Sequence, residues 1–248
     1  MFAREHELVA HLAGQHRRLW PGGTAHRLVK AERGYGSGVA DLVLLDFDTM
    51  AQSTRQASGL PPVPTACHAY VVGALRRLGP TPFSECGRLD PNVNERENLR
   101  ILRQLIDTGY VLRTGSAVAV APEMGSPIRR IVAIEAKLKD WRGGLLQAKR
   151  YRSYANLTYL AMPLAEAQHA AASHADVALA LGIGIIGVDE STRILLRAGR
   201  GEPTESGVRA WAEESEFAEA LGCPRRLATP FPARFSVPSP DQLVAGAV

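Results

Sequence analysis

Two charged side chains, Glu135 and Lys137, stand in an otherwise apolar run, residues 131–138, where they could do chemistry. Successive side chains of an extended segment point to opposite faces, so Glu135 and Lys137 share one face of a predicted strand. A buried carboxylate and a buried ammonium are costly unless they pair or bind something. The pattern therefore predicts either a functional pair or a structural ion pair.

A third charge, Asp41, stands at the head of a second strand-like run, residues 40–47. If the two strands lie side by side, Asp41 comes near Glu135. Two carboxylates are what Mg²⁺ takes from protein while phosphate and water fill its other positions. Such a cation polarises a phosphodiester and lowers the pKa of an attacking water, so these residue types predict phosphodiester hydrolysis.

The helix expected next, residues 141–155, carries Gln147 and Tyr151 one turn apart, so both side chains lie on one flank. An acidic residue, a gap, Glu-x-Lys on an apolar strand and then Gln-x-x-x-Tyr together resemble the PD-(D/E)XK nuclease superfamily, in particular its RecB-like members. The resemblance implies that Gln147 touches a metal-bound water or the Lys137 region. It also implies that Tyr151 steadies the helix or a phosphate.

The same resemblance assigns roles to the charged residues. It implies that Asp41, Glu135 and the backbone carbonyl of Ala136 hold Mg²⁺ or Mn²⁺. It implies that Lys137 orients or helps to deprotonate the attacking water and stabilises developing negative charge. A purely structural salt bridge between Glu135 and Lys137 would have the same sequence.

The segment Glu5-His6-Glu7-Leu8-Val9 resembles the ERELV-type opening of archaeal Holliday-junction resolvases, whose leading glutamate joins the active site. The resemblance implies that Glu5, rather than Glu7, holds a second metal or its water shell. His6 stands where that pattern has arginine, and a surface glutamate that caps a helix explains Glu5 equally well.

Length and composition bound the class of protein. With 248 residues, 46% of them hydrophobic, the chain can form one large or two small domains. No charge-free apolar run approaches the roughly 18 residues of a membrane span, and the charged N-terminal helix is no signal peptide. The three cysteines have neither zinc-ligand spacing nor an even count. We therefore expect a cytoplasmic protein with no membrane span and no zinc site.

Positive charge is concentrated around the predicted site. Residues 126–154 hold eight Lys or Arg against two acidic residues, whereas residues 155–248 hold seven basic and eleven acidic residues. A polyanion such as DNA is the natural partner of such a patch, although a solvated helix face is the alternative. The candidate DNA contacts on the predicted helix are Arg142, Lys149 and Arg150.

Ninety-four positions separate Asp41 from Glu135, and turn-rich segments, 58–64 and 122–127, bracket the excess. The composition predicts an inserted module over residues 64–122. Helical patterns in this module cover residues 65–78, 82–89 and 94–108. A short hairpin follows at residues 110–120.

This order resembles a winged helix-turn-helix, which implies DNA binding through its third helix. The resemblance implies contacts from the following residues: Arg96, Arg100 and Arg103 on that helix, Asn92 and Asn94 at its start, and Arg113 on the wing. The module is nearly neutral, so a winged helix used for packing or protein contact is the alternative.

The whole chain is predicted to be α/β. Residues 1–60 and 126–228 are expected to form a restriction-endonuclease-like core, which is a mixed central sheet flanked by helices, and the small winged-helix insert interrupts it. Further elements are expected in the core: a helix at 3–18, strands at 26–32, 157–162, 183–188 and 193–197, and helices at 165–181 and 207–222. The proline-rich tail, 229–248, is expected to be irregular and is the only sign of a protein partner.

The sequence thus predicts a Mg²⁺-dependent DNA nuclease whose insert helps to hold duplex or branched DNA. Many nucleases of this superfamily work as dimers, which makes a homodimer an expectation of the resemblance. One alternative is a catalytically silent nuclease fold that binds DNA or regulates. Another is a defence or toxin-like nuclease that a partner protein holds in check.

Overall fold

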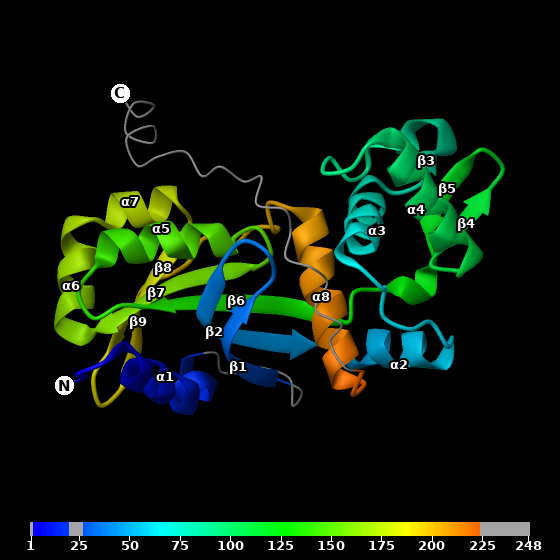
Figure 1. Cartoon of the computed structure of the whole chain (residues 1–248). Coiled ribbons are helices and arrows are strands. Elements are labelled where there is room, and N and C mark those ends of the chain that lie inside the picture. Colours follow the sequence, from blue (N-terminus) through cyan, green and yellow to red (C-terminus); the bar gives the residue numbers. More distant parts are fainter. Residues whose placement is uncertain (1, 20–26, 224–248) are drawn as a thin grey trace, which may run out of the picture.

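The computed structural model describes residues 2–19 and 27–223, and the expected tail at 229–248 lies outside them. The architecture is α/β, as expected, with a mixed six-stranded sheet flanked by helices. A second lobe with its own three-stranded sheet stands beside it (Figure 1).

The large sheet has the order β1-β2-β6-β7-β8-β9. Its strands are β1 (Arg27–Gly34), β2 (Val39–Phe47), β6 (Ile128–Ala136), β7 (Leu157–Pro163), β8 (Ile183–Val188) and β9 (Thr192–Leu196). The central strands β6, β7 and β8 are parallel to one another, and β1, β2 and β9 join antiparallel. The central strands are apolar along nearly their whole length because helices cover both of their faces.

Helix α1 (Glu5–Leu19) covers one face, where Leu8 and Leu12 pack with side chains of β2 and β6. The other face carries α5 (Trp141–Tyr151), α6 (Leu164–Ser173) and α7 (Ala175–Ala180). The single helix expected at 165–181 is thus two helices. His174 has non-helical dihedrals between them, and its ring stacks on Trp141 with centroids 3.8 Å apart.

The second lobe follows α2 (Thr49–Ala57), a helix that the sequence reasoning did not anticipate. Its elements in chain order are α3 (Ala66–Leu78), β3 (Thr81–Pro82), the 3₁₀ helix η1 (Phe83–Arg88), α4 (Glu95–Asp107), β4 (Val111–Thr114) and β5 (Ala117–Val120). The small sheet has the order β3-β5-β4, and a short 3₁₀ turn, η2 (Pro122–Met124), leads back to β6. Leu75, Ile101, Leu102 and Leu105 lie in a separate apolar cluster beneath it.

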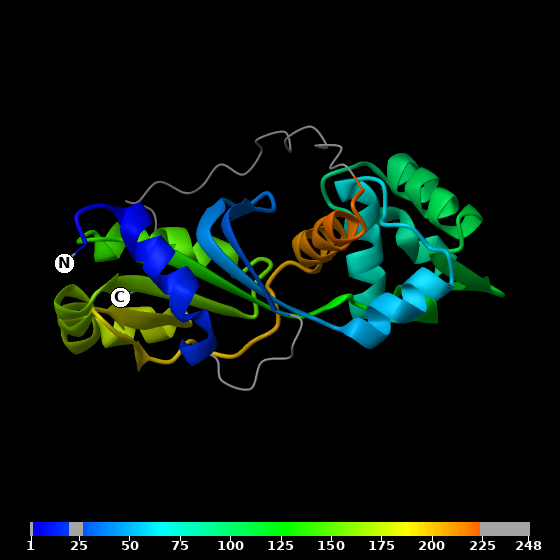
Figure 2. The ribbon, with the colours of Figure 1, turned by 90° about the horizontal axis from the view of Figure 1, so that it is seen from below.

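Helix α8 (Ser206–Ala220) lies between the lobe and the β1–β2 hairpin, as two perpendicular views show (Figures 1 and 2). A helix was expected at 207–222, and it is present, but the sequence did not show what covers its charged side chains. Three glutamates that would normally face water are buried, because the helix is enclosed from both sides: Glu213, Glu214 and Glu216. Each of them has a cationic partner.

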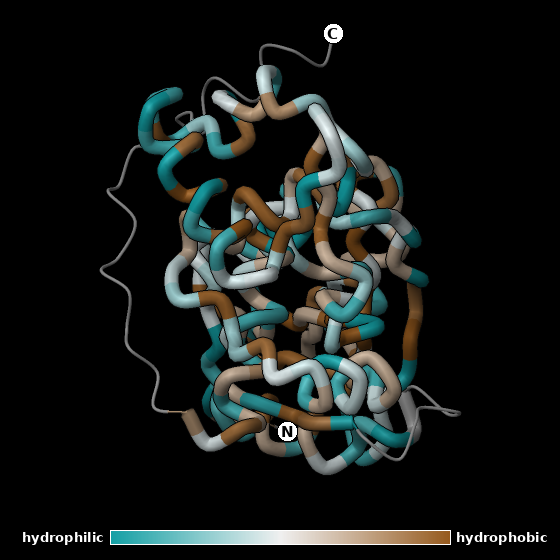
Figure 3. Tube along the Cα trace, turned by 90° about the vertical axis from the view of Figure 1, so that its right-hand side faces the viewer, coloured by the Kyte–Doolittle hydropathy of each residue, from teal (hydrophilic) through white to brown (hydrophobic). Residues whose placement is uncertain are grey.

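Hydrophilic and hydrophobic residues alternate over short stretches of the chain (Figure 3). Across residues 2–19 and 27–223, none of the helices is long and apolar enough to cross a membrane.

Candidate active site

The site forms where β2 and β6 part. Leu42 pairs with Ile134 in the antiparallel ladder, so Asp41 and Glu135 are the next residues along their strands. There the main-chain pairing ends, and the Ala136 amide donates instead to Oδ2 of Asp41 at 2.7 Å. The side chain takes the place of a main-chain acceptor, which satisfies the amide and fixes the Asp41 carboxylate at the end of the ladder.

Glu135 is the central residue of the cluster and is only 2% exposed. Its Oε1 lies 2.8 Å from Nζ of Lys137, so the two side chains share one face as the alternation predicted. Its Oε2 accepts a hydrogen bond from the Tyr151 hydroxyl at 2.5 Å. That hydroxyl also lies 2.7 Å from the carbonyl oxygen of Val39 and thereby ties α5 to both strands.

Local sequence explains why α5 lies so close to the strands. The Asp140 side chain caps the helix by accepting from the Gly143 amide at 2.9 Å. A Cβ on Gly144 would come within 2.5 Å of Leu160 Cδ1 and 3.0 Å of Lys137 Cγ. Glycine at this position therefore lets the helix approach the strand and leaves room for the lysine stem.

Lys137 lies between two carboxylates. Its Nζ is 3.5 Å from Oε2 of Glu5, which reaches it from the first turn of α1. The lysine side chain is 16% exposed and Glu5 is 47% exposed, so the cluster opens to solvent on the α1 side. Glu7, by contrast, accepts from the Ala3 amide.

Burial controls the protonation of the cluster. Burial raises the pKa of Asp41 and outweighs the Ala136 hydrogen bond and the charge of Lys137, which lower it. Burial also raises the pKa of Glu135 against the hydrogen bonds from Lys137 and Tyr151. Burial alone would lower the pKa of Lys137, but the carboxylates, Glu135 foremost, raise it. The acids are thus poorly compensated by protein groups, and an added cation would stabilise them.

Oxygen chemistry at the site fits a hard divalent cation. Two carboxylates and the Ala136 carbonyl are donors of the kind that Mg²⁺ takes. Among residues 2–19 and 27–223, Oδ1 of Asp41 accepts no hydrogen bond, whereas both oxygens of Glu135 already have partners. Within those ranges, no group of three or more His, Cys, Asp or Glu side chains is arranged so that it could hold a metal ion by itself.

Gln147 is half-buried, one turn after Gly144 and one before Tyr151, and thus lies on the flank of α5 that contains both. Its amide makes no hydrogen bond to any described residue. Arg142, Lys149 and Arg150 are exposed on the same helix, and the Arg142 guanidinium lies 5.1 Å above the Trp141 ring. These three cations lie on the helix that carries Tyr151, and they form no ion pair with the carboxylates of the site.

The arginines expected on the insert lie in the second lobe. Arg96, Arg100 and Arg103 are exposed on α4, and Arg113 is exposed on β4. Arg100 donates to Glu97 at 2.7 Å, and Arg113 stands over the Phe83 ring. The lobe is at the opposite end of the molecule from the carboxyl end of β6 (Figure 1), so these side chains and the carboxylate cluster do not form one compact site.

The two asparagines expected beside them have structural roles. Asn94 caps α4 by accepting from the Glu97 amide at 2.9 Å, and Asn92 donates to the Asp90 side chain. Both amides serve the turn that leads into the helix.

Sequence reasoning missed Glu32. In the β1–β2 ladder Ala31 pairs with Leu42 and Arg33 with Ala40, which puts Glu32 across from Asp41. Its φ of 51° is unusual for a side-chain-bearing residue, and its charge contributes to the raised pKa of Asp41. The strand was expected to end at this residue, so no local signal connected it with the site.

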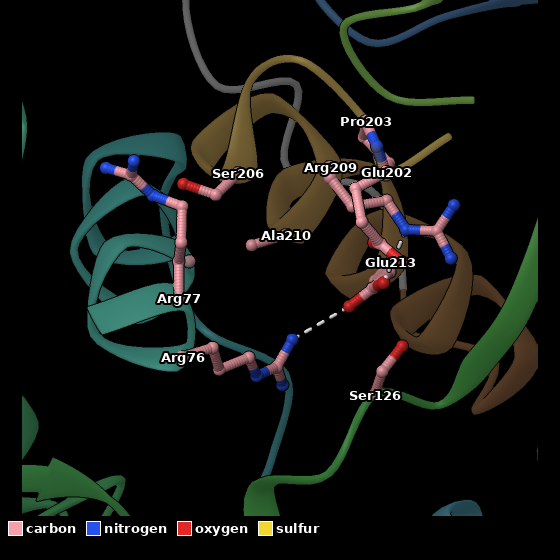
Figure 4. Close-up of a pocket in the computed structure, with 10 residues that line it drawn as sticks. Arg76, Arg77, Ser126, Glu202, Pro203, Ser206, Arg209, Ala210 and Glu213 are labelled. Atoms are coloured by element: carbon pink, nitrogen blue, oxygen red, sulfur yellow. Dashed lines mark hydrogen bonds and ion pairs between the residues drawn. The ribbon is translucent and has the colours of Figure 1, made fainter. Parts of the chain in front are cut away.

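Two grooves of the surface lie away from the carboxylate cluster. A groove of about 360 Å³ separates α3 from α8 (Figure 4), and a second of about 490 Å³ adjoins it beside β6. Glu213 of α8 pairs across the first groove with Arg76 of α3 at 2.7 Å, and it pairs with Arg209 of its own helix at 2.5 Å. Neither groove includes a residue of the carboxylate cluster, and the central charges of the first are already paired. We therefore take the cluster, not the grooves, as the candidate active site.

Comparisons of the chain with protein-family models, with curated proteins and with solved structures found no match.

Proposed function

We propose that the protein is a Mg²⁺- or Mn²⁺-dependent DNA nuclease that hydrolyses phosphodiester bonds at a PD-(D/E)XK-type site. The observation that carries the proposal is the meeting of Asp41, Glu135 and Lys137 at the point where β2 and β6 part. The two acids are 94 positions apart in the chain, so the fold alone brings them to one place.

The arrangement of elements supports a restriction-endonuclease-like core. The acidic residues stand on adjacent antiparallel strands, β2 and β6, and α5 with Gln147 and Tyr151 follows directly. Strand β7 then joins β6 in parallel, and β8 joins β7. A strand, a helix and a parallel strand after Glu-x-Lys are what the resemblance requires.

The second lobe supports a winged-helix insert. Its order is helix, strand, short helix, helix and two strands, and β3 joins the final hairpin in one sheet. Helix α4 is then the recognition helix, and the exposed Arg96, Arg100 and Arg103 are its candidate phosphate or base contacts. DNA that contacts both this lobe and the cations of α5 would extend along the long dimension of the molecule.

The residues of the cluster divide the chemistry among them. Asp41, Glu135 and the Ala136 carbonyl would hold the cation, which supplies charge to the scissile phosphate and acidifies a water. Lys137 keeps its proton and holds the attacking water near the phosphate, where its charge stabilises the negative charge that develops. Tyr151 fixes the orientation of Glu135 through their hydrogen bond. Glu5 adds a carboxylate on the open side.

The first test is cleavage of labelled single-stranded, duplex and four-way-junction DNA in Mg²⁺, Mn²⁺ or EDTA. Lys137→Ala should lose cleavage by about 100-fold or more, since it removes a charge aimed at the reacting phosphate. Lys139→Ala is the matched control, because Lys139 is an exposed lysine two residues further on. Cation-independent cutting, or equal cutting by wild type and Lys137→Ala, would overturn the proposal.

One observation favours a second candidate, a catalytically silent nuclease fold that binds DNA. Both oxygens of Glu135 are already engaged, by Lys137 and by Tyr151, as in a closed structural ion pair. This candidate predicts DNA binding without cleavage in any cation. It also predicts the same DNA affinity after Glu135→Ala, whereas a nuclease that binds DNA through a bridging cation loses affinity in that variant.

A further inference from the structure

The buried glutamates of α8 connect three separate parts of the fold. Glu213 pairs with Arg76 of α3, and Glu214 pairs with Arg55 of α2. Glu216 is fully buried and faces the β1–β2 hairpin. One helix therefore joins the second lobe to the hairpin from which Asp41 emerges.

Glu216 is held by the hairpin through several polar groups. Its Oε1 accepts from the Tyr35 hydroxyl at 2.7 Å, and its Oε2 pairs with Lys30. Arg33 Nε lies 3.4 Å from Oε1. Tyr35 is 1% exposed and begins the turn between the strands, so this contact fixes the turn against α8.

Helix α5 and the residues that follow it hold the other side of the same turn. The hydroxyls of Ser37 and Ser153 lie 2.5 Å apart, and the Tyr35 ring packs edge-on against Tyr154 with centroids 4.8 Å apart. Gly38, at φ 121°, lies close to the Tyr151 ring. The turn is therefore clamped between α8 and the end of α5.

Strand β2 leaves this clamped turn and reaches Asp41 within three residues of Gly38. On the way, the Val39 carbonyl oxygen lies 2.7 Å from the Tyr151 hydroxyl, which donates to Glu135. The position of Asp41 relative to Glu135 is thus set at one end by the ladder and at the other by the turn.

We propose that Tyr35 and Glu216 are positioning residues for the active site. Their contact holds Asp41 in register with Glu135. Because α8 also pairs with the second lobe, the same contact links the position of Asp41 to that lobe. The inference rests on the proposed nuclease function. Because a misplacement of about 1 Å can cost on the order of 100-fold in rate, loss of one hydrogen bond at the turn should be measurable.

The test compares Tyr35→Phe and Glu216→Gln with the control Tyr154→Phe. Tyr154 belongs to the same buried aromatic group, but its hydroxyl has no hydrogen-bond partner among the described residues, so its loss breaks no contact. Two readouts are needed: kcat and KM for DNA cleavage, and Mn²⁺ binding to the DNA-free protein by electron paramagnetic resonance. Thermal unfolding reports whether each variant folds.

Tyr35→Phe should lower kcat about tenfold and weaken Mn²⁺ binding several-fold, with KM for DNA and the folded fraction little changed. Glu216→Gln should act in the same direction and more strongly, because it also removes the charge that pairs with Lys30 and lies near Arg33. The double variant should lose less than the sum of the two single losses, because both single variants weaken the contact between Tyr35 and Glu216. Tyr154→Phe should match wild type.

Equal kcat and Mn²⁺ affinity in wild type and Tyr35→Phe would overturn the inference. A parallel loss in Tyr35→Phe and Tyr154→Phe, tracking a lower Tm, would also overturn it and leave a packing role. If wild type binds Mn²⁺ but does not cut DNA, the nuclease proposal fails and the Mn²⁺ readout still decides the positioning role. If wild type binds no Mn²⁺, both fail.

Discussion

Removal of the Glu214 charge should strongly destabilise the protein, because the buried Arg55 guanidinium would lose its counter-charge. The two side chains are fully buried and form a bidentate pair with both distances at 2.6 Å. The guanidinium also donates to the Pro61 carbonyl at 2.8 Å and lies over the Phe217 ring. Glu214 in turn accepts from the Val63 amide.

The magnitude follows from these contacts. Breaking a buried ion pair by removing one partner costs about 3–5 kcal/mol, so Glu214→Gln should lower the free energy of unfolding by that amount. Replacing both partners with apolar residues, as in Arg55→Met with Glu214→Leu, removes the stranded charge and is often neutral by itself. Here it should recover only part of the loss, because the Pro61 carbonyl and the Val63 amide lose partners worth about 1–3 kcal/mol each.

Urea unfolding monitored by circular dichroism measures these differences as shifts of the midpoint at constant slope. Glu97→Gln is the matched control, since Glu97 pairs with Arg100 on the exposed side of α4, and it should leave the midpoint nearly unchanged. A loss below about 1 kcal/mol in Glu214→Gln, or additive losses in the double variant, would refute the reasoning.

Three further variants test other parts of the structure. Asp41→Asn should raise Tm at pH 7, because the folded-state pKa of Asp41 is raised and its ionised form therefore destabilises the fold. The gain in Tm over wild type should shrink as the pH falls towards about 4, where Asp41 of the wild type also becomes neutral. A difference in Tm that does not depend on pH would contradict this. Gly144→Ala should cost about 1–3 kcal/mol in urea unfolding and reduce cleavage, since its Cβ would press on Leu160 and the lysine stem; unchanged stability would exclude the close approach. Arg103→Ala should weaken DNA binding in a fluorescence titration and reduce the salt slope by about one, and an unaltered slope would argue against a phosphate contact.

The sequence by itself determined the local elements and which charged residues could act together. Alternation in an apolar run put Glu135 and Lys137 on one face, and they do contact each other. Turn-rich segments at 58–64 and 122–127 bracketed the insert, because turn signals act over a few residues. The mixed sheet flanked by helices was confirmed for the same reason, since strand and helix periods are local.

Only the tertiary structure decided how distant residues meet. The bond from the Ala136 amide to Asp41, the position of Glu32 across from Asp41, and the link from Tyr151 to Glu135 all depend on strand register or helix docking. The two hydrogen bonds join residues at least 16 positions apart. The position of Glu32 depends on the register of β1 and β2, which no local pattern specifies.

Helix α8 illustrates the limit most clearly. Glu213, Glu214 and Glu216 have the composition of a solvent-facing surface, yet the fold buries all three. A helix period shows which side chains share a face, but not what covers that face. Arg55, Arg76 and Lys30, which compensate these charges, come from elements more than 130 residues away, so the pairing exists only once the lobe and the sheet are assembled.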